Sequence, residues 1–382
     1  MKKIVIAIDS FKGSLSTFEA GNAVEEAAKE VFENAEVSIS PIADGGEGTA
    51  QAIISATNGE LVRCIVCNPL GEKIEAAYGF IPYTKTAIIE MSAAAGITLI
   101  EESELNPMNT TTFGVGEMIL DAISKGCRKF VIGIGGSATN DGGVGMLQAL
   151  GFEFLDKNGK QVLPGAKGLK DIAEIKTENA VKELKECSFC VACDVKNILC
   201  GENGCSAVYG PQKGATPEMI EDMDLWLEKY ALLTKDIIQT SDANIPGTGA
   251  AGGMGFALMS YLNATLKSGI ELVMEETCLE RKVSEADLII TGEGRLDGQS
   301  YMGKAPIGVA KLAKKYNKPV IAFSGCVTED AIICNEHGID AFFPIVRKPC
   351  TLDEAMNVNN AYKNLKDTAY QVFSLIKIYE NK

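Results

Sequence analysis

The strongest chemical signal in the sequence is a glycine-rich segment, residues 135–143, placed between an apolar run and a helical pattern. The apolar residues 130–134 predict a short buried strand, and residues 144–150 predict a helix. Glycine lets backbone N–H groups approach an anion closely, and a helix N-terminus favours negative charge. The segment therefore predicts a phosphate-binding loop with contacts at Gly135, Gly136, Ser137, Thr139 and Asn140. A turn that uses glycine only for its backbone dihedrals is the alternative.

Carboxylates in turns and at predicted strand ends are the second chemical signal. Asp141 lies inside the glycine-rich segment and Asp44 lies in another acidic, glycine-rich turn, so both are predicted ligands of Mg²⁺. Asp194 ends a predicted strand over residues 188–194, and Asp297 lies in the loop that follows a predicted strand at 287–291. Both are candidates for a catalytic carboxylate, and a turn-forming or helix-capping role is the alternative for each.

Basic and hydroxyl side chains follow other predicted strands. Ser10 and Lys12 come directly after the first strand, at the carboxyl end where open α/β sheets bind ligands. Residues 298–305 nearly fit the P-loop pattern, but alanine replaces the Ser or Thr that would hold Mg²⁺, so we reject a true P-loop. Lys304 near a helix start remains a candidate for phosphate binding, with an ordinary surface lysine as the alternative.

Histidine and cysteine offer less chemistry. The single histidine, His337, precedes a glycine like a helix C-terminal residue, which favours a structural role. Acid–base work would therefore fall to carboxylates or lysine. Cys187, Cys190 and Cys193 are spaced like metal ligands, but the residues between them read as a buried strand, where cysteine acts as a small hydrophobe.

The elements that must position these residues alternate in the manner of α/β folds. A strand at residues 3–8 precedes a capping box at 16–19 and an amphipathic helix at 18–32. After residue 58 the residues alternate in a way that predicts a hairpin, and the alternation of predicted strands and helices returns at residue 285. We therefore expect a discontinuous α/β domain, residues 1–58 plus 285–382, with residues 59–284 inserted as a second domain.

Composition excludes several classes of protein. The net charge of −15 argues against nucleic acid or an anionic membrane as the main partner. The N-terminus does not resemble a signal peptide, and no apolar run has the length of a membrane span. Twelve cysteines without a secretion signal indicate reduced thiols, so we expect a cytoplasmic protein.

Five motifs together, in this order, resemble one known family. They occupy residues 9–14, 43–49, 133–143, 193–197 with 210–215, and 291–300. The chain resembles the bacterial type-1 glycerate kinases from about residue 2 to the C-terminal helix. One departure is the segment 196–200, where many relatives carry an acidic residue followed by Asn-Pro-Leu.

The resemblance implies a fold, a reaction and partners. It implies two α/β domains with the site between them: a doubly wound, mostly parallel flavodoxin-like domain and an inserted domain with a mixed sheet. It also implies ATP-dependent phosphorylation of D-glycerate, with 2-phosphoglycerate favoured over 3-phosphoglycerate. ATP, Mg²⁺ and glycerate are then the expected partners, and the protein is expected as a monomer or homodimer.

Phosphoryl transfer needs positioning, neutralised phosphate charge and a carboxylate near the attacking hydroxyl. We assign catalysis to Asp194, with Asp297 second, and to Lys12; Ser10, Lys12 and Arg295 are expected to bind the substrate. A non-catalytic sensor of small anions, or a kinase of another small hydroxy acid, is the alternative. A dinucleotide-dependent dehydrogenase lacks its glycine fingerprint after the first strand.

Overall fold

The computed structural model describes residues 1–43, 46, 48–298, 300–302 and 304–380. The chain divides into two units. Unit 1 comprises Met1–Asp44, Ser55–Thr57 and Ile270–Lys382, and unit 2 comprises Gly45–Ile54 and Asn58–Gly269. The division after Gly269 lies earlier in the chain than the boundary at 284 that the sequence suggested, and the segment 45–54 belongs to unit 2.

Unit 1 is built on a parallel five-stranded sheet with the order β13-β12-β11-β1-β2. Its strands are β1 (Lys3–Ile8), β2 (Glu36–Ile39), β11 (Leu288–Leu296), β12 (Val320–Val327) and β13 (Ala341–Pro344). The chain leaves β1 toward β2 on one side, and β11, β12 and β13 follow on the other side. This is the flavodoxin-like order, and its switch point lies between β1 and β11.

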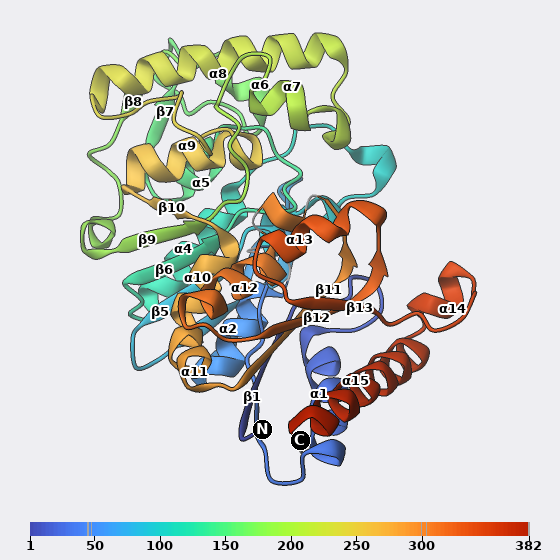
Figure 1. Ribbon diagram of the computed structural model, residues 1–382. Helices are drawn as coiled ribbons and strands as arrows, with labels where there is room; N and C mark the ends of the chain where they lie inside the picture. The colour runs from blue at the N-terminus through green and yellow to red at the C-terminus, as the bar shows by residue number, and fades with distance from the viewer. Residues whose placement is uncertain (44–45, 47, 299, 303, 381–382) are drawn as a thin grey trace. The chain divides into compact units, whose positions relative to one another are not determined.

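Helices cover the faces of this sheet. Helix α1 (Thr17–Val31) begins with the predicted capping box, in which the Ser16 side chain accepts from the Glu19 backbone and the Glu19 side chain accepts from the Ser16 backbone. Helix α15 (Val358–Glu380) lies beside α1, and both pack on the core around Ile4, Ile6 and Phe373 (Figure 1). The other helices of this unit are α10 (Gly269–Glu276), α11 (Leu279–Glu285), α12 (Ala305–Lys315), α13 (Ile333–Glu336) and α14 (Leu352–Met356).

Two elements of unit 1 differ from expectation. Strand β11 continues to Leu296, so most of the predicted loop after residue 291 is strand, because its backbone pairs with β12 as far as Leu296 opposite Val327. The sequence also predicts a capping box at Thr351 and Glu354 that opens the C-terminal helix; the box exists, but it opens the short α14 and not the C-terminal helix. The extra strand length carries the side chains of residues 293 and 295 toward the site described below.

Unit 2 contains a mixed six-stranded sheet with the order β10-β9-β6-β5-β4-β3. The hairpin β3 (Glu60–Cys67) and β4 (Lys73–Ile81) is antiparallel, as is the pair of β4 with β5 (Thr86–Glu90). The pairs linking β5, β6 (Lys129–Gly133), β9 (Ser188–Ala192) and β10 (Thr265–Lys267) are parallel. A separate antiparallel pair joins β7 (Glu153–Leu155) and β8 (Glu174–Lys176).

The helices of unit 2 surround one hydrophobic core, in which Phe130 stacks on Phe189 with ring centroids 4.8 Å apart. They are α3 (Ser92–Ala95), α4 (Phe113–Ser124), α5 (Val144–Ala149), α6 (Ala166–Leu169), α7 (Cys205–Tyr209), α8 (Pro217–Ile237) and α9 (Ala250–Leu262). Helix α2 (Thr49–Thr57) has residues in both units. None of the helices in the described part of the chain has both the length and the apolar character needed to cross a membrane.

Candidate active site

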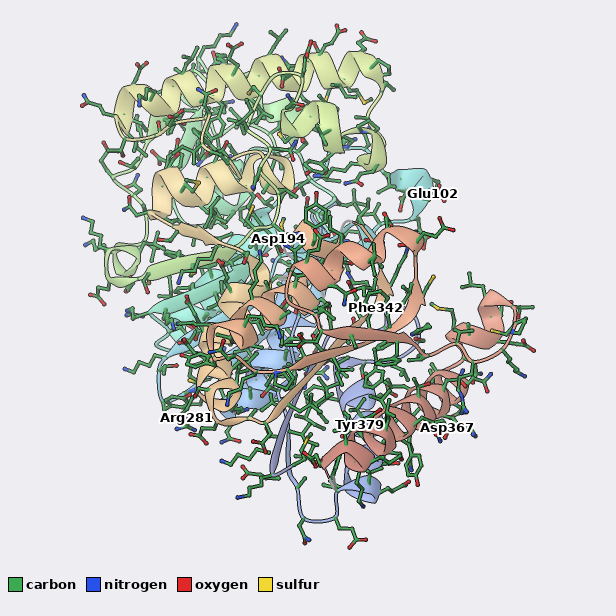
Figure 2. All side chains as sticks on the ribbon, viewed as in Figure 1. Glu102, Asp194, Arg281, Phe342, Asp367 and Tyr379 are labelled. Atoms are coloured by element: carbon green, nitrogen blue, oxygen red, sulfur yellow. The ribbon has the colours of Figure 1, made fainter. Side chains whose placement is uncertain are left out.

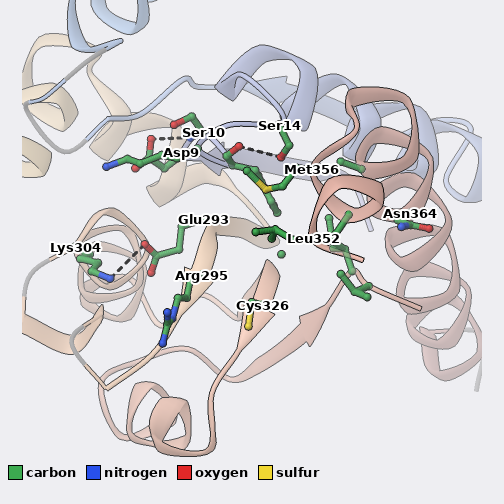
Figure 3. A pocket seen from close by; sticks show the side chains of 18 residues that line it. Asp9, Ser10, Ser14, Glu293, Arg295, Lys304, Cys326, Leu352, Met356 and Asn364 are labelled. Atoms are coloured by element: carbon green, nitrogen blue, oxygen red, sulfur yellow. Dashed lines mark hydrogen bonds and ion pairs between the residues drawn. The ribbon is translucent and has the colours of Figure 1, made fainter. Parts of the chain in front are cut away.

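A cavity of about 510 Å³ opens within unit 1 (Figure 3). Its walls come from the segment after β1, the ends of β11 and β12, the segment after β13, and helices α14 and α15. The cavity therefore lies at the carboxyl ends of β1 and β11, on the two sides of the switch point. Open α/β sheets bind their ligands at this place, because neighbouring connections leave the sheet in opposite directions there.

The polar end of the cavity is set by strand pairing. Ile8 lies opposite Gly292 in the parallel register, and the Asp9 backbone N–H donates to the Gly292 carbonyl at 3.0 Å. The next residues along the two strands, Asp9 and Glu293, consequently reach the same end of the sheet, and both line the cavity. Ser10 and Lys12, which the sequence predicted as substrate-binding residues, line it as well.

Glu293 is the carboxylate that sequence reasoning missed. The residue is only 8% exposed, and its Oε1 accepts a hydrogen bond of 2.7 Å from the Ser300 hydroxyl. Oε2 lies 3.9 Å from the Lys304 ammonium. Burial raises the pKa of Glu293 above its usual value, while the Ser300 hydrogen bond and the Lys304 charge oppose that shift. The sequence signal that could have identified Glu293 is a carboxylate between Gly292 and Gly294, directly after a predicted strand.

Asp297 lies beside this group, held by two cations. Lys304 Nζ lies 3.3 Å from Oδ1 of Asp297, and Arg295 Nε lies 3.4 Å from Oδ2. The Ser300 backbone N–H also donates to Oδ1 at 3.1 Å. The structure thus brings together three predicted site residues, Arg295, Asp297 and Lys304, and two of them, Arg295 and Lys304, line the cavity directly.

The glycine-rich segment of unit 2 has a different environment from the one predicted. Asp141 is buried, and its Oδ1 accepts from the Gly143 N–H at 3.1 Å. Its Oδ2 accepts from the Thr112 N–H and hydroxyl at 2.8 and 2.9 Å and from the Gly145 N–H at 3.3 Å. The protein's own carboxylate therefore occupies donors at the start of α5, where a phosphate was expected. Burial raises the pKa of Asp141, and these hydrogen bonds oppose the shift.

Lys213 supports the same segment and was not singled out from the sequence. It is 1% exposed, and its Nζ donates to the Ser137 hydroxyl at 2.9 Å and to the Thr139 carbonyl at 2.6 Å. Burial lowers the pKa of Lys213 to about 8. A lysine inside the glycine-flanked motif 210–215 was the signal that could have identified it.

The five predicted phosphate contacts of this segment divide into two groups. Gly135 and Gly136 are exposed, whereas Ser137, Thr139 and Asn140 are buried. The Asn140 amide donates to the Ser206 hydroxyl at 2.9 Å, which ties it to α7. Phosphate binding by these residues stays a prediction, and the observed contacts favour a structural role for the buried three.

Asp194 is solvent-exposed and labelled in Figure 2. Its Oδ1 accepts a hydrogen bond of 3.1 Å from the backbone N–H of Gly269, the first residue of α10. This is the contact of a helix-capping aspartate. The catalytic role predicted for Asp194 remains untested, because this contact neither requires nor excludes it.

Magnesium, the metal predicted from the sequence, can be compared with the available oxygen donors. Asp44, one predicted ligand, lies outside the described residues, and Asp141 already uses both carboxylate oxygens as acceptors. Asp9 and Glu293, by contrast, line the cavity and supply the one or two carboxylates that Mg²⁺ takes beside phosphate oxygens. The cavity residues therefore fit the ion. Across the described residues, no cluster of three or more His, Cys, Asp or Glu side chains is suited to a metal.

Comparisons with known proteins agree with one another. A family model described as "Glycerate kinase family" matches residues 4–377. The Glycerate 2-kinase of Escherichia coli K12 is 48% identical over 95% of both chains, and the Glycerate kinase of Bacillus subtilis 168 is 45% identical over 98% of both. A crystal structure described as "putative glycerate kinase 2 from Salmonella typhimurium LT2" matches with a TM-score of 0.92 and 45% identity over the full length of both chains.

Proposed function

The chain belongs to the glycerate kinase family, and from that membership we propose that it transfers the γ-phosphoryl group of ATP to D-glycerate. The observation that carries the proposal is the full-length similarity to glycerate kinases, at 43–48% identity for five relatives. The cavity at the switch point supports it, since it joins cations, hydroxyls and carboxylates at one end. A cytoplasmic enzyme is part of the same proposal.

The 2-hydroxyl is the proposed acceptor, so the product is 2-phosphoglycerate. The support is the name of the Escherichia coli relative, Glycerate 2-kinase, which shares 48% of its residues with this chain. The acceptor hydroxyl is adjacent to the carboxylate in glycerate. A clamp on that carboxylate would therefore place the 2-hydroxyl next to it, and the 3-hydroxyl one carbon further away.

Ser10, Lys12 and Arg295 are proposed to bind that carboxylate. All three line the polar end of the cavity, and a guanidinium can hold a carboxylate with two parallel hydrogen bonds. Lys304 is proposed to meet the transferring phosphate. Its ammonium lies between Glu293 and Asp297 at 3.9 and 3.3 Å, which holds it at the edge of the cavity. Fixed cations near the phosphates stabilise charge without reorganising during the reaction.

A carboxylate is needed to orient or deprotonate the attacking hydroxyl. Asp194 and Asp297 stay candidates, and the structure adds Glu293. We favour Glu293, because it lines the cavity, whereas Asp297 is already paired with Arg295 and Lys304 and Asp194 caps α10. Asp9 is then the residue that would hold Mg²⁺, and the bound ion would neutralise charge on the phosphate oxygens.

A panel of acceptors tests the proposal. ADP release from Mg-ATP is measured with D-glycerate, L-glycerate, lactate and glycolate as separate acceptors. We expect D-glycerate to give the largest kcat/KM, with no ADP release when no acceptor is present. A sensor without turnover would bind D-glycerate but release no ADP with any acceptor, and a kinase of another hydroxy acid would prefer a different member of the panel.

A further inference from the structure

The cavity of unit 1 has two chemically different ends. The polar end carries the cations Lys12, Arg295 and Lys304 together with Asp9 and Glu293. The opposite end is apolar and comes from the segment after β13, from α14 and from the start of α15. Its apolar side chains are Ile345, Val346, Leu352, Ala355, Met356 and Ala361. Figure 3 shows Leu352 and Met356 extending from α14 on the side of the cavity opposite Lys304.

Glycerate does not account for the apolar end. It is a three-carbon acid with a carboxylate and two hydroxyls, so every part of it suits the polar end. A cavity of about 510 Å³ is in the range that pockets for much larger ligands occupy. The lip of the apolar end is also open to water, because Leu352 is 75% exposed and Val346 is 37% exposed. Apolar side chains that continue a cavity wall outward indicate a surface that a ligand covers.

We propose that the apolar end binds the adenine ring of ATP, with the phosphates extending to the cations at the polar end. This assignment rests on the proposed kinase function and adds to it the unit that holds the nucleotide. ATP joins a purine, which has flat apolar faces and a polar edge, to a polyanionic tail. The apolar end of the cavity suits the purine, and the cations at the polar end suit the tail. Phosphates at Lys304 would also bring the transferring group to the carboxylates Asp9 and Glu293.

Asn364 supplies the polar edge that such a base needs. It lies on α15, lines the cavity and is partly buried (Figure 3). An asparagine amide has a donor and an acceptor side by side, and it can pair with the N6 amino group and N7 of adenine. Guanine presents two acceptors, O6 and N7, at the same edge, so the amide oxygen would face an acceptor. The geometry therefore predicts preference for ATP over GTP.

Binding of ADP to the full-length protein without glycerate tests the site independently of turnover. Leu352→Asp places a charge against the base, and the exposure of Leu352 makes this change compatible with folding. We expect ADP affinity to fall roughly tenfold or more, with the KM for ATP rising in parallel and the KM for glycerate unchanged. The matched control is Leu375→Asp on α15, which is 53% exposed and not part of the cavity, and which should bind ADP like the wild type.

Asn364→Ala is the second variant, and it decides the outcome if Leu352→Asp melts at a much lower temperature than its control. We expect the preference for ATP over GTP, taken from the ratio of their KM values, to fall about tenfold. Wild-type ADP affinity in Leu352→Asp together with an unchanged nucleotide preference in Asn364→Ala would overturn the inference, even if glycerate phosphorylation is intact. Conversely, Leu352-dependent ADP binding in a protein that never phosphorylates glycerate would support the nucleotide site and contradict the proposed function.

Discussion

Replacing Glu293 by glutamine separates chemistry from folding in the proposed site. Glutamine keeps the volume of the side chain, and its carbonyl oxygen can still accept the 2.7 Å hydrogen bond from Ser300. The change removes one negative charge that lies 3.9 Å from Lys304, whose side chain is 37% exposed. An ion pair that is open to solvent to this degree contributes about 0–1 kcal/mol to stability. Little stability should therefore be lost.

The pKa of Glu293 indicates the sign of any change in stability. Burial raises that pKa in the folded protein, so the folded state binds the proton more tightly than the unfolded chain does. The stabilisation from this proton is complete below the unfolded pKa and is lost as the pH rises through the folded pKa. At neutral pH the wild type carries the cost of the buried charge, and the glutamine variant does not. We expect its melting temperature at pH 7 to equal or exceed that of the wild type.

Turnover should respond very differently. A positioned base contributes roughly 10²- to 10⁴-fold to a rate, which corresponds to about 3–5 kcal/mol of activation free energy. We therefore expect kcat of Glu293→Gln to fall by that factor, while the KM for glycerate changes little. The assay is ADP release at saturating Mg-ATP, with Asp297→Asn and Asp194→Asn measured in parallel. A kcat for Glu293→Gln within about threefold of the wild type would refute the assignment, and a severe loss in one of the other two would move the role to that residue.

Three further predictions concern stability and metal. Gly143 has φ +74° and a Cβ added there would lie 2.5 Å from Cβ of Ala257, so Gly143→Ala should lower unit 2 stability by about 2–4 kcal/mol in urea unfolding. Gly159→Ala is the control: φ is +75° but no described atom lies within 4 Å of the added Cβ, so only about 1–2 kcal/mol should be lost. Lys213→Met removes a buried ammonium whose pKa falls from 10.5 to about 8 on folding. Between pH 8 and 10.5 the unfolded chain binds this proton more tightly than the folded protein, so thermal melts should show the wild type gaining up to about 3 kcal/mol of stability relative to the variant across that range. Stability profiles that run parallel with pH for the two proteins would contradict the burial argument. Activity, measured as ADP release, should survive chelation of zinc and iron. It should stop when Mg²⁺ is removed and return when Mg²⁺ is added, and inactivation that only zinc reverses would contradict this.

Local patterns predicted the elements that depend on local interactions. The first strand, the capping box at Ser16 and the helix after it follow from side-chain periodicity and hydrogen bonds between near neighbours. The antiparallel hairpin of β3 and β4 also followed from alternation and a turn. The extent of β11 did not, because Glu293 and Arg295 become strand residues only through pairing with β12, and the sequence does not encode that partner locally.

The candidate site was predictable only in part for the same reason. Ser10, Lys12, Arg295 and Lys304 were found from their positions after predicted strands, and the structure gathers them at one cavity. Phosphate binding at the glycine-rich segment stays a prediction, and the sequence did not show that its own Asp141 accepts from donors at the helix start, because that contact depends on how the chain folds. The apolar end of the cavity was invisible in the sequence, because α14 and α15 reach it only through tertiary packing.

Phosphorus NMR of the reaction mixture tests the central claim most directly. Purified protein is incubated with Mg-ATP and D-glycerate, and the appearance of the phosphomonoester signal is followed together with the loss of the γ-phosphate signal. We predict that the two change in equal amounts and that the new signal matches authentic 2-phosphoglycerate. A signal that matches 3-phosphoglycerate would contradict the proposed acceptor hydroxyl. An unchanged ATP spectrum, with protein that is folded and binds ADP, would contradict the proposed kinase activity itself.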